Sequence, residues 1–204
     1  SLFFTVGPSL DLYISSLFYY GSSQFYLQSF DYLSIIFRDI LLPCILIYIL
    51  ILPLLSRYIK IKIIFFNYKF SLKEIYLIWV SQIFTLVLFV NLVLKNLWGR
   101  SRPGDIVEFN GADVFTTWFQ YSDACNTNCS FVSGDASVGF SIIILYFITK
   151  KIVFINLSIV FGILLGIIRI IAGGHFSSDI LFAGLVIIIS NLIIYKVYKK
   201  HYDY

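Results

Sequence analysis

The stretch RIIAGGHFSSD, Arg169 to Asp179, places an arginine, a histidine and an aspartate between two long runs of isoleucine, leucine and valine. Charge at a membrane boundary is costly and is by default a sign of function. If the chain turns helical after Gly173 and Gly174, His175 and Asp179 stand four residues apart on one helix face. Asp179 can then accept a hydrogen bond from one imidazole nitrogen and leave the other free to attack, as nucleophilic catalysis requires.

The composition around this stretch indicates an integral membrane protein. Of the 204 residues, 59% are hydrophobic and 13% are charged, and the mean hydropathy is +0.90. A soluble domain carries about a quarter of its residues as charged side chains. Uncharged runs lie at 40–56, 75–94, 136–149, 152–168 and 180–195, and none alternates with the period of two that a barrel strand requires.

We therefore predict an all-α fold, a polytopic membrane helical bundle of six transmembrane helices whose first helix, at residues 1–6, is truncated. No internal repeat or linker divides the chain, so we expect a single membrane-embedded domain over residues 1–204.

The charged residues divide between the two sides of this bundle. Two acidic residues, Glu74 and Asp203, share one side with ten basic residues: Arg57, Lys60, Lys62, Lys69, Lys73, Lys150, Lys151, Lys196, Lys199 and Lys200. The other side carries nine acidic and five basic residues. Basic residues near the ends of spans mark the cytoplasmic side, so the 169–179 stretch is predicted to face outward.

Three polar segments lie at ends of spans on this outer side: KNLWGRSRP at 95–103, SFVSGDAS at 130–137, and the stretch at 169–179. Each alone has an ordinary explanation, as basic anchors at a helix end, a helix cap or an interfacial histidine. Together they supply cations, a nucleophile with an orienting carboxylate, and backbone N–H groups at a helix start. Such a set suits phosphoryl transfer, which mainly requires the three phosphoryl oxygens to be held and neutralised.

The pattern resembles the three-part signature of the type-2 phosphatidic acid phosphatase superfamily, membrane relatives of the vanadium haloperoxidases. It reads Lys95, six residues, Arg102-Pro103; then Ser133-Gly134; then Arg169, five residues, His175, three residues, Asp179. The resemblance implies a helical bundle of six spans that removes phosphate from lipid phosphates or diphosphates through a phosphohistidine, with no metal and no cofactor.

The same resemblance implies roles for individual residues. Lys95, Arg102 and Arg169 would bind the phosphoryl group. Ser133 and the Gly134 N–H would join them at a helix N-terminus, which favours an anion. His175 would attack phosphorus and Asp179 would orient it.

Two positions depart from the family pattern. Asp135 stands where the family usually has the histidine that protonates the leaving oxygen, and Ile168 stands where a serine is usual. A carboxyl group can be a general acid when a neighbouring negative charge favours its protonated form, so Asp135 is a candidate acid. It could instead cap the entering helix or tune phosphate binding. The VSGDAS version of the motif resembles bacterial lipid A phosphatases, those acting at the 4′ position included.

The expected protein is thus a lipid phosphatase of the bacterial inner membrane with its active site facing the periplasm. Its partners are membrane lipids and a lipid phosphate or diphosphate substrate, with no nucleic acid. Lipid A, undecaprenyl diphosphate, phosphatidylglycerol phosphate and phosphatidic acid all remain open as substrates. A non-catalytic lipid-phosphate binder is the alternative of another class. A transporter would need ionisable residues in mid-span, and the five uncharged runs have none.

The long outer connection at 104–131 contains two cysteines four residues apart, Cys125 and Cys129. On an oxidising outer face, one helical turn would bring them within reach of a disulfide. Two free thiols in a loop are the alternative, and the sequence leaves both open.

Overall fold

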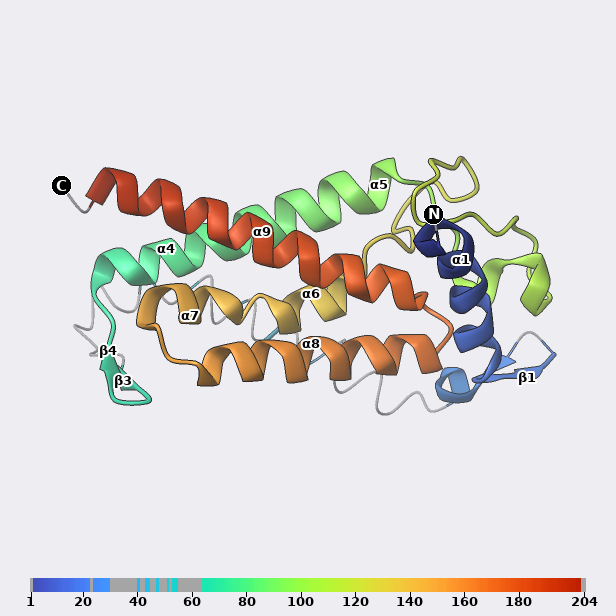
Figure 1. Ribbon diagram of the computed structural model, residues 1–204, viewed down its shortest axis with the longest axis horizontal. Helices are drawn as coiled ribbons and strands as arrows, with labels where there is room; N and C mark the ends of the chain where they lie inside the picture. The colour runs from blue at the N-terminus through green and yellow to red at the C-terminus, as the bar shows by residue number, and fades with distance from the viewer. Residues whose placement is uncertain are drawn as a thin grey trace.

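The structure is a computed structural model that describes residues 2–22, 24–29 and 64–202, together with positions 40, 43, 44, 47, 51, 53 and 54. Most positions of the span predicted at 40–56 fall outside the described residues. Within them, the chain is mostly helical, and the long helices lie roughly along one axis (Figure 1).

The elements follow one another in this order: α1 (Leu2–Ser16), β1 (Tyr19–Gly21), β2 (Gln24–Phe25), η1 (Tyr26–Ser29), β3 (Ile64–Phe65), β4 (Tyr68–Lys69), α4 (Leu72–Gln82), η3 (Ile83–Leu94), α5 (Lys95–Leu97), η4 (Pro103–Asp105), η5 (Val107–Phe109), α6 (Gly134–Phe140), α7 (Ile143–Thr149), α8 (Val153–Ile171) and α9 (Ser177–Tyr202). β1 pairs with β2 and β3 with β4, each as a small antiparallel hairpin.

Three helical segments of the described chain are long and apolar enough to cross a membrane: Leu72–Leu97, Val153–Ile171 and Ser177–His201. The first joins α4, the π-helical stretch η3 and α5 into one rod. It begins at a capping box, in which the Ser71 hydroxyl accepts from the Glu74 N–H while the Glu74 carboxylate accepts from the Ser71 N–H. This pair satisfies backbone donors that a helix start otherwise leaves unbonded.

The predicted span at 136–149 is instead a shorter apolar segment, Gly134–Thr149, divided into α6 and α7. The Phe140 carbonyl accepts a hydrogen bond from the Ser158 hydroxyl of α8 at 2.7 Å. The Ile144 N–H, its partner in an unbroken helix, bonds the Ser141 carbonyl instead. A side chain that inserts into the backbone ladder is a usual cause of a helix break. The tight packing of α6 on α8 makes this insertion possible, because the backbone at Gly139 lies directly against Gly162.

The prediction of an all-α bundle is therefore borne out in part. The described chain contains three long apolar helices, one shorter apolar segment and two small hairpins, and it does not show six spans. The first helix, predicted at residues 1–6, extends further along the chain, because α1 runs from Leu2 to Ser16.

The two ends of the bundle differ in charge. One end carries β3–β4, the start of α4, the α7–α8 connection and the end of α9 (Figure 1). Its basic residues are Lys69, Lys73, Lys150, Lys151, Lys196, Lys199 and Lys200. The opposite end carries α5, the start of α6, the α8–α9 connection and α1. The three polar segments singled out in the sequence thus meet at one end, away from the lysine-rich one.

Candidate active site

Backbone hydrogen bonds join the three polar segments directly. The Cys129 N–H donates to the Lys95 carbonyl at 3.1 Å, and the Ser130 N–H donates to the Arg100 carbonyl at 2.8 Å. The Ser133 N–H lies 3.3 Å from the Asp179 carbonyl. Segments far apart in sequence are therefore held as one structure.

His175 lies in the turn before α9, which begins at Ser177. The expectation that His175 and Asp179 share a helix face is therefore wrong in detail, since only Asp179 is helical, in the first turn of α9. The two side chains still meet. His175 Nδ1 lies 3.7 Å from Asp179 Oδ2 and 3.5 Å from the Ser130 hydroxyl. Both His175 and Asp179 are buried.

The Asp179 carboxylate is held by donors on both oxygens. Oδ1 accepts from Arg100 Nη1 at 2.6 Å, and Oδ2 accepts from the Ser130 hydroxyl at 2.5 Å and the Phe176 N–H at 2.8 Å. A buried charge is tolerated when it is paired and hydrogen-bonded in this way. The carboxylate is therefore fixed in position beside the imidazole.

The environment of His175 keeps its imidazole neutral. Burial is the main cause that lowers the pKa of His175; Asp179 raises it, the charges of Lys95 and Arg169 lower it, and the net pKa is about 4. A neutral imidazole has a free lone pair on one nitrogen, which is what a nucleophile needs.

Two of the predicted phosphate-binding cations lie over glycine backbone. Lys95 Nζ is 3.4 Å from the position that a Cβ would take at Gly134, the first residue of α6. The Arg169 guanidinium lies against Gly174, where a Cβ would stand 2.9 Å from Cζ. A side chain larger than hydrogen at Gly174 would therefore displace Arg169.

The third cation is joined to the first through the outer loop. Arg102 Nη2 donates to the Asn128 carbonyl at 2.7 Å, and Lys95 Nζ donates to the Asn128 side chain at 3.2 Å. Asn128 belongs to the CNTNC loop, which the structure closes with a disulfide between Cys125 and Cys129, whose Cα atoms are 5.7 Å apart.

At the start of α6, Ser133 is the helix cap, and its hydroxyl accepts from the Ala136 N–H at 3.4 Å. Asp135 makes a different contact. Its Oδ2 lies 3.1 Å from Arg169 Nε, an ion pair without hydrogen-bond geometry. The carboxylate of Asp135 therefore lies beside a group expected to bind phosphate.

Sequence reasoning missed three polar side chains of this centre. Arg100 and Ser130 lie inside the predicted polar segments at 95–103 and 130–137, and Asp11 is one of the nine acidic residues predicted on the outer side. The sequence pattern assigns none of the three a role of its own. Arg100 is 0% exposed and Asp11 is 1% exposed. No local pattern could have found the Asp11–Arg100 pair, because its members stand 89 positions apart.

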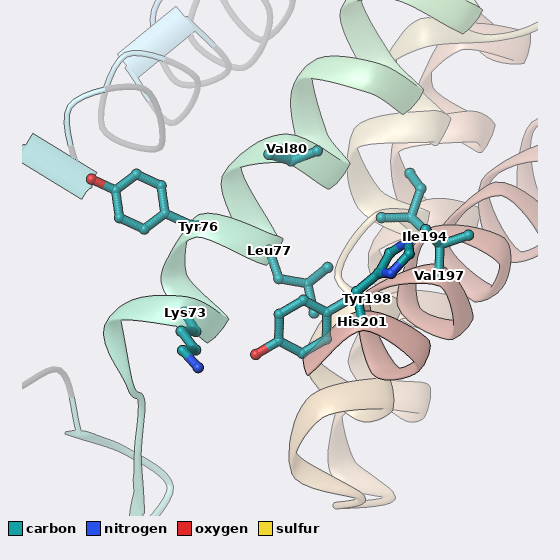
Figure 2. Close-up of a pocket in the computed structure, with 8 residues that line it drawn as sticks. All are labelled: Lys73, Tyr76, Leu77, Val80, Ile194, Val197, Tyr198 and His201. Carbon is teal, nitrogen blue, oxygen red and sulfur yellow. The ribbon is translucent and has the colours of Figure 1, made fainter. Parts of the chain in front are cut away.

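A hollow of about 330 Å³ lies at the other end of the bundle, between α4 and α9 (Figure 2). It is lined by Lys73, Tyr76, Leu77, Val80, Ile194, Val197, Tyr198 and His201. This lining contains a histidine but no carboxylate to orient it, so the hollow lacks the nucleophile pair found at the opposite end. Among the described residues, no three His, Cys, Asp or Glu side chains gather as a group that could hold a metal ion.

Long apolar helices and a polar centre with a buried histidine beside a carboxylate together fit a membrane-associated phosphatase. Residues 76–203 match the PAP2 superfamily. The chain belongs to this superfamily, a family of metal-independent phosphatases that act on phosphomonoesters.

Three relatives named lipid A 4′-phosphatase are similar to the chain. The protein of Francisella tularensis subsp. novicida (strain U112) is 34% identical over 213 residues, which cover 100% of this chain and 92% of the relative. That of Rhizobium leguminosarum is 36% identical over 53% of this chain and 46% of the relative. That of Rhizobium etli is 38% identical over a stretch that covers 46% of this chain and 38% of the relative. No solved structure matches the chain significantly.

Proposed function

We propose that this membrane phosphatase removes the phosphate at the 4′ position of lipid A by hydrolysing its phosphomonoester through a phosphohistidine on His175. The observation that carries the proposal is the buried His175, with Asp179 on one side and the cations Lys95 and Arg169 near enough to act on it. The similarity over the whole chain to a protein named lipid A 4′-phosphatase supports the choice of substrate.

In the first step, the phosphate is bound by Lys95, Arg102 and Arg169, with Ser133 and the Gly134 N–H at the start of α6. A helix N-terminus presents backbone N–H groups that favour an anion. His175 Nε2 attacks phosphorus in line with the leaving oxygen, the N–P bond forms and the bond from phosphorus to the lipid oxygen breaks. Asp179 accepts a hydrogen bond from Nδ1–H, stays ionised, and stabilises the cationic imidazole that forms when Nε2 is phosphorylated.

Asp135 is proposed as the general acid of this step. Its carboxylate pairs with Arg169. An arriving phosphate competes for that cation and brings negative charge close to the carboxylate, which favours its protonated form. The proton then passes to the leaving alkoxide. In the second step the same carboxylate removes a proton from the water that attacks the phosphohistidine, and inorganic phosphate is released.

We further propose that residues 1–204 form one catalytic unit that faces the periplasm of a bacterial inner membrane. The lysine-rich end of the bundle would lie in the cytoplasm under the rule that basic residues near span ends stay inside. The active-site segments at 95–103, 130–137 and 169–179 are gathered at the opposite end. Undecaprenyl diphosphate and phosphatidylglycerol phosphate are the alternative substrates.

The test is a phosphate-release assay on the purified protein. Its substrates are lipid A carrying phosphate only at position 4′, lipid A carrying it only at position 1, undecaprenyl diphosphate, phosphatidylglycerol phosphate and phosphatidic acid. We expect release from the 4′ form. His175→Ala should abolish release, whereas the matched variant of the other histidine, His201→Ala, should retain it. Release from another lipid of the panel but not from the 4′ form would refute the substrate, and turnover by His175→Ala would refute the mechanism.

A further inference from the structure

A chain of buried ionised groups extends from the active site to the N-terminal helix. Arg100 Nη1 donates to Asp179 Oδ1 at 2.6 Å, and Arg100 Nη2 donates to Asp11 Oδ2 at 2.9 Å. The side chains of Arg100 and Asp179 are 0% exposed and that of Asp11 is 1% exposed. The Arg100 guanidinium also lies 4.2 Å from the centre of the Phe176 ring, so all its faces are occupied by protein.

Asp11 makes further contacts that tie α1 to the start of α9. Its carboxylate accepts from the Ser177 hydroxyl at 2.6 Å, and from the Ser178 N–H at 2.8 Å and hydroxyl at 2.5 Å. Ser177 and Ser178 directly follow the turn that carries His175. Asp11 lies outside the residues that match the PAP2 superfamily, which begin at Tyr76. The N-terminal helix α1 therefore contributes a residue to the core of the site.

The charges of Asp179, Arg100 and Asp11 must be considered together. Asp179 must carry negative charge to stabilise the imidazole of His175 as it becomes cationic. Arg100 alone would cancel that charge, because the two form a close ion pair. Asp11 adds a second negative charge on the far side of Arg100, so the three groups together carry a net charge of −1. The Asp179 carboxylate is thus held rigidly, and the group of three side chains keeps a net negative charge.

We propose that Arg100 and Asp11 are positioning residues for the His175–Asp179 pair: Arg100 fixes the Asp179 carboxylate, and Asp11 restores the negative charge that Arg100 would neutralise. The inference rests on the proposed function, because it assumes that His175 is the nucleophile. Neither residue touches the phosphate in this account. Both act through Asp179.

The proposal predicts opposite electrostatic effects on His175. The charged groups facing this histidine are Lys95, Arg169 and Asp179, with Arg100 and Asp11 behind Asp179. Asp11→Asn removes a negative charge and should lower the pKa of His175. Arg100→Gln removes a positive charge and should raise it. Each shift should be roughly half a unit to one unit, smaller than that of a charge in direct contact. A purely structural role would not give shifts of opposite sign.

The test measures His175 directly. The chain has two histidines, so a protein with labelled histidine and the change His201→Gln gives the NMR signals of His175 alone. We would titrate this protein, its Asp11→Asn and Arg100→Gln forms, and Glu108→Gln, an exposed charge at the same end of the molecule, as a matched control. Lowered and raised pKa values for the first two, with no shift for Glu108→Gln, are expected. Unchanged values, or shifts of the same sign, would overturn the proposal.

Turnover gives the second readout. Both substitutions should lower kcat by about tenfold or more and leave KM within about twofold, since neither residue binds the phosphate. A parallel change in kcat and KM would overturn the positioning role. If Arg100→Gln does not fold, Asp11→Asn decides alone, because the amide oxygen of asparagine can still accept from the Ser177 hydroxyl and the Ser178 N–H. The NMR titration requires no substrate, so it stands even if the wild-type protein releases no phosphate from any lipid, a result that would refute only the proposed function.

Discussion

Replacing Gly174 with alanine should slow the enzyme strongly without unfolding it. The new Cβ would stand 2.9 Å from Arg169 Cζ and 3.1 Å from Nε, and closer still to Nη2. Heavy atoms in contact prefer about 3.5–4.0 Å, so the guanidinium must move by roughly 1 Å. Gly174 does not have a positive φ, and the displaced group is the end of a flexible side chain. The backbone should therefore accept alanine, with little change in the unfolding temperature.

The cost should appear in catalysis. A hydrogen bond to a charged group contributes about 1.5–3 kcal/mol, and about 1.36 kcal/mol corresponds to a tenfold change in rate. Loss of one such bond from Arg169 to the phosphate should lower kcat/KM by about 10- to 100-fold. The assay is phosphate release from lipid A, with thermal unfolding measured in parallel.

Gly104→Ala is the matched control for this substitution. Its Cβ would meet the Gly173 carbonyl oxygen at an ordinary 3.5 Å, so activity should be retained. The decisive comparison is a double-mutant cycle, in which Gly174→Ala should cost nothing further in an Arg169→Ala background. A full additional loss in that background would refute the explanation through Arg169.

Three other outcomes are expected. Asp135→Asn should slow release from a lipid by about tenfold or more but affect an activated aryl phosphate far less, because a good leaving group departs without a proton; equal losses on both would remove the acid role. Activity should persist in excess EDTA and fall with vanadate, which adopts the geometry of the transition state; loss in chelator that a divalent ion restores would contradict this. Because burial lowers the pKa of His175 to about 4, the nucleophile should stay neutral as pH falls through 6.5 and become protonated only near pH 4. The loss of kcat/KM that reports His175 protonation should therefore lie well below pH 6.5, and a midpoint at 6.5 would show that His175 is not buried as described.

The candidate phosphate-binding and nucleophile residues could be proposed from the sequence because their spacing is local and their chemistry is specific. His175 and Asp179 stand four residues apart, and Arg169 precedes them on the same stretch. Predictions of this kind depend on short-range geometry, which the sequence contains directly.

The features that escaped prediction depend on tertiary contacts. The break between α6 and α7 follows from the Ser158 hydroxyl of α8 bonding the Phe140 carbonyl, and the uncharged run there gives no sign of it. The role of Arg100 depends on Asp11, which reaches it from α1. The pairing of Asp135 with Arg169 likewise joins α6 to α8. In each case one polar side chain meets a partner that the pattern of apolar residues does not identify.

The central claim is that His175 becomes phosphorylated during turnover, and the most direct measurement is rapid quenching in base followed by peptide mass analysis. The protein, mixed with a lipid A substrate labelled in its 4′ phosphate, should carry acid-labile label on the peptide containing His175 within the first turnover. The label should be present in His201→Ala and absent from His175→Ala. Phosphate release through the first turnover with no label on His175, or with label on another residue, would contradict the account.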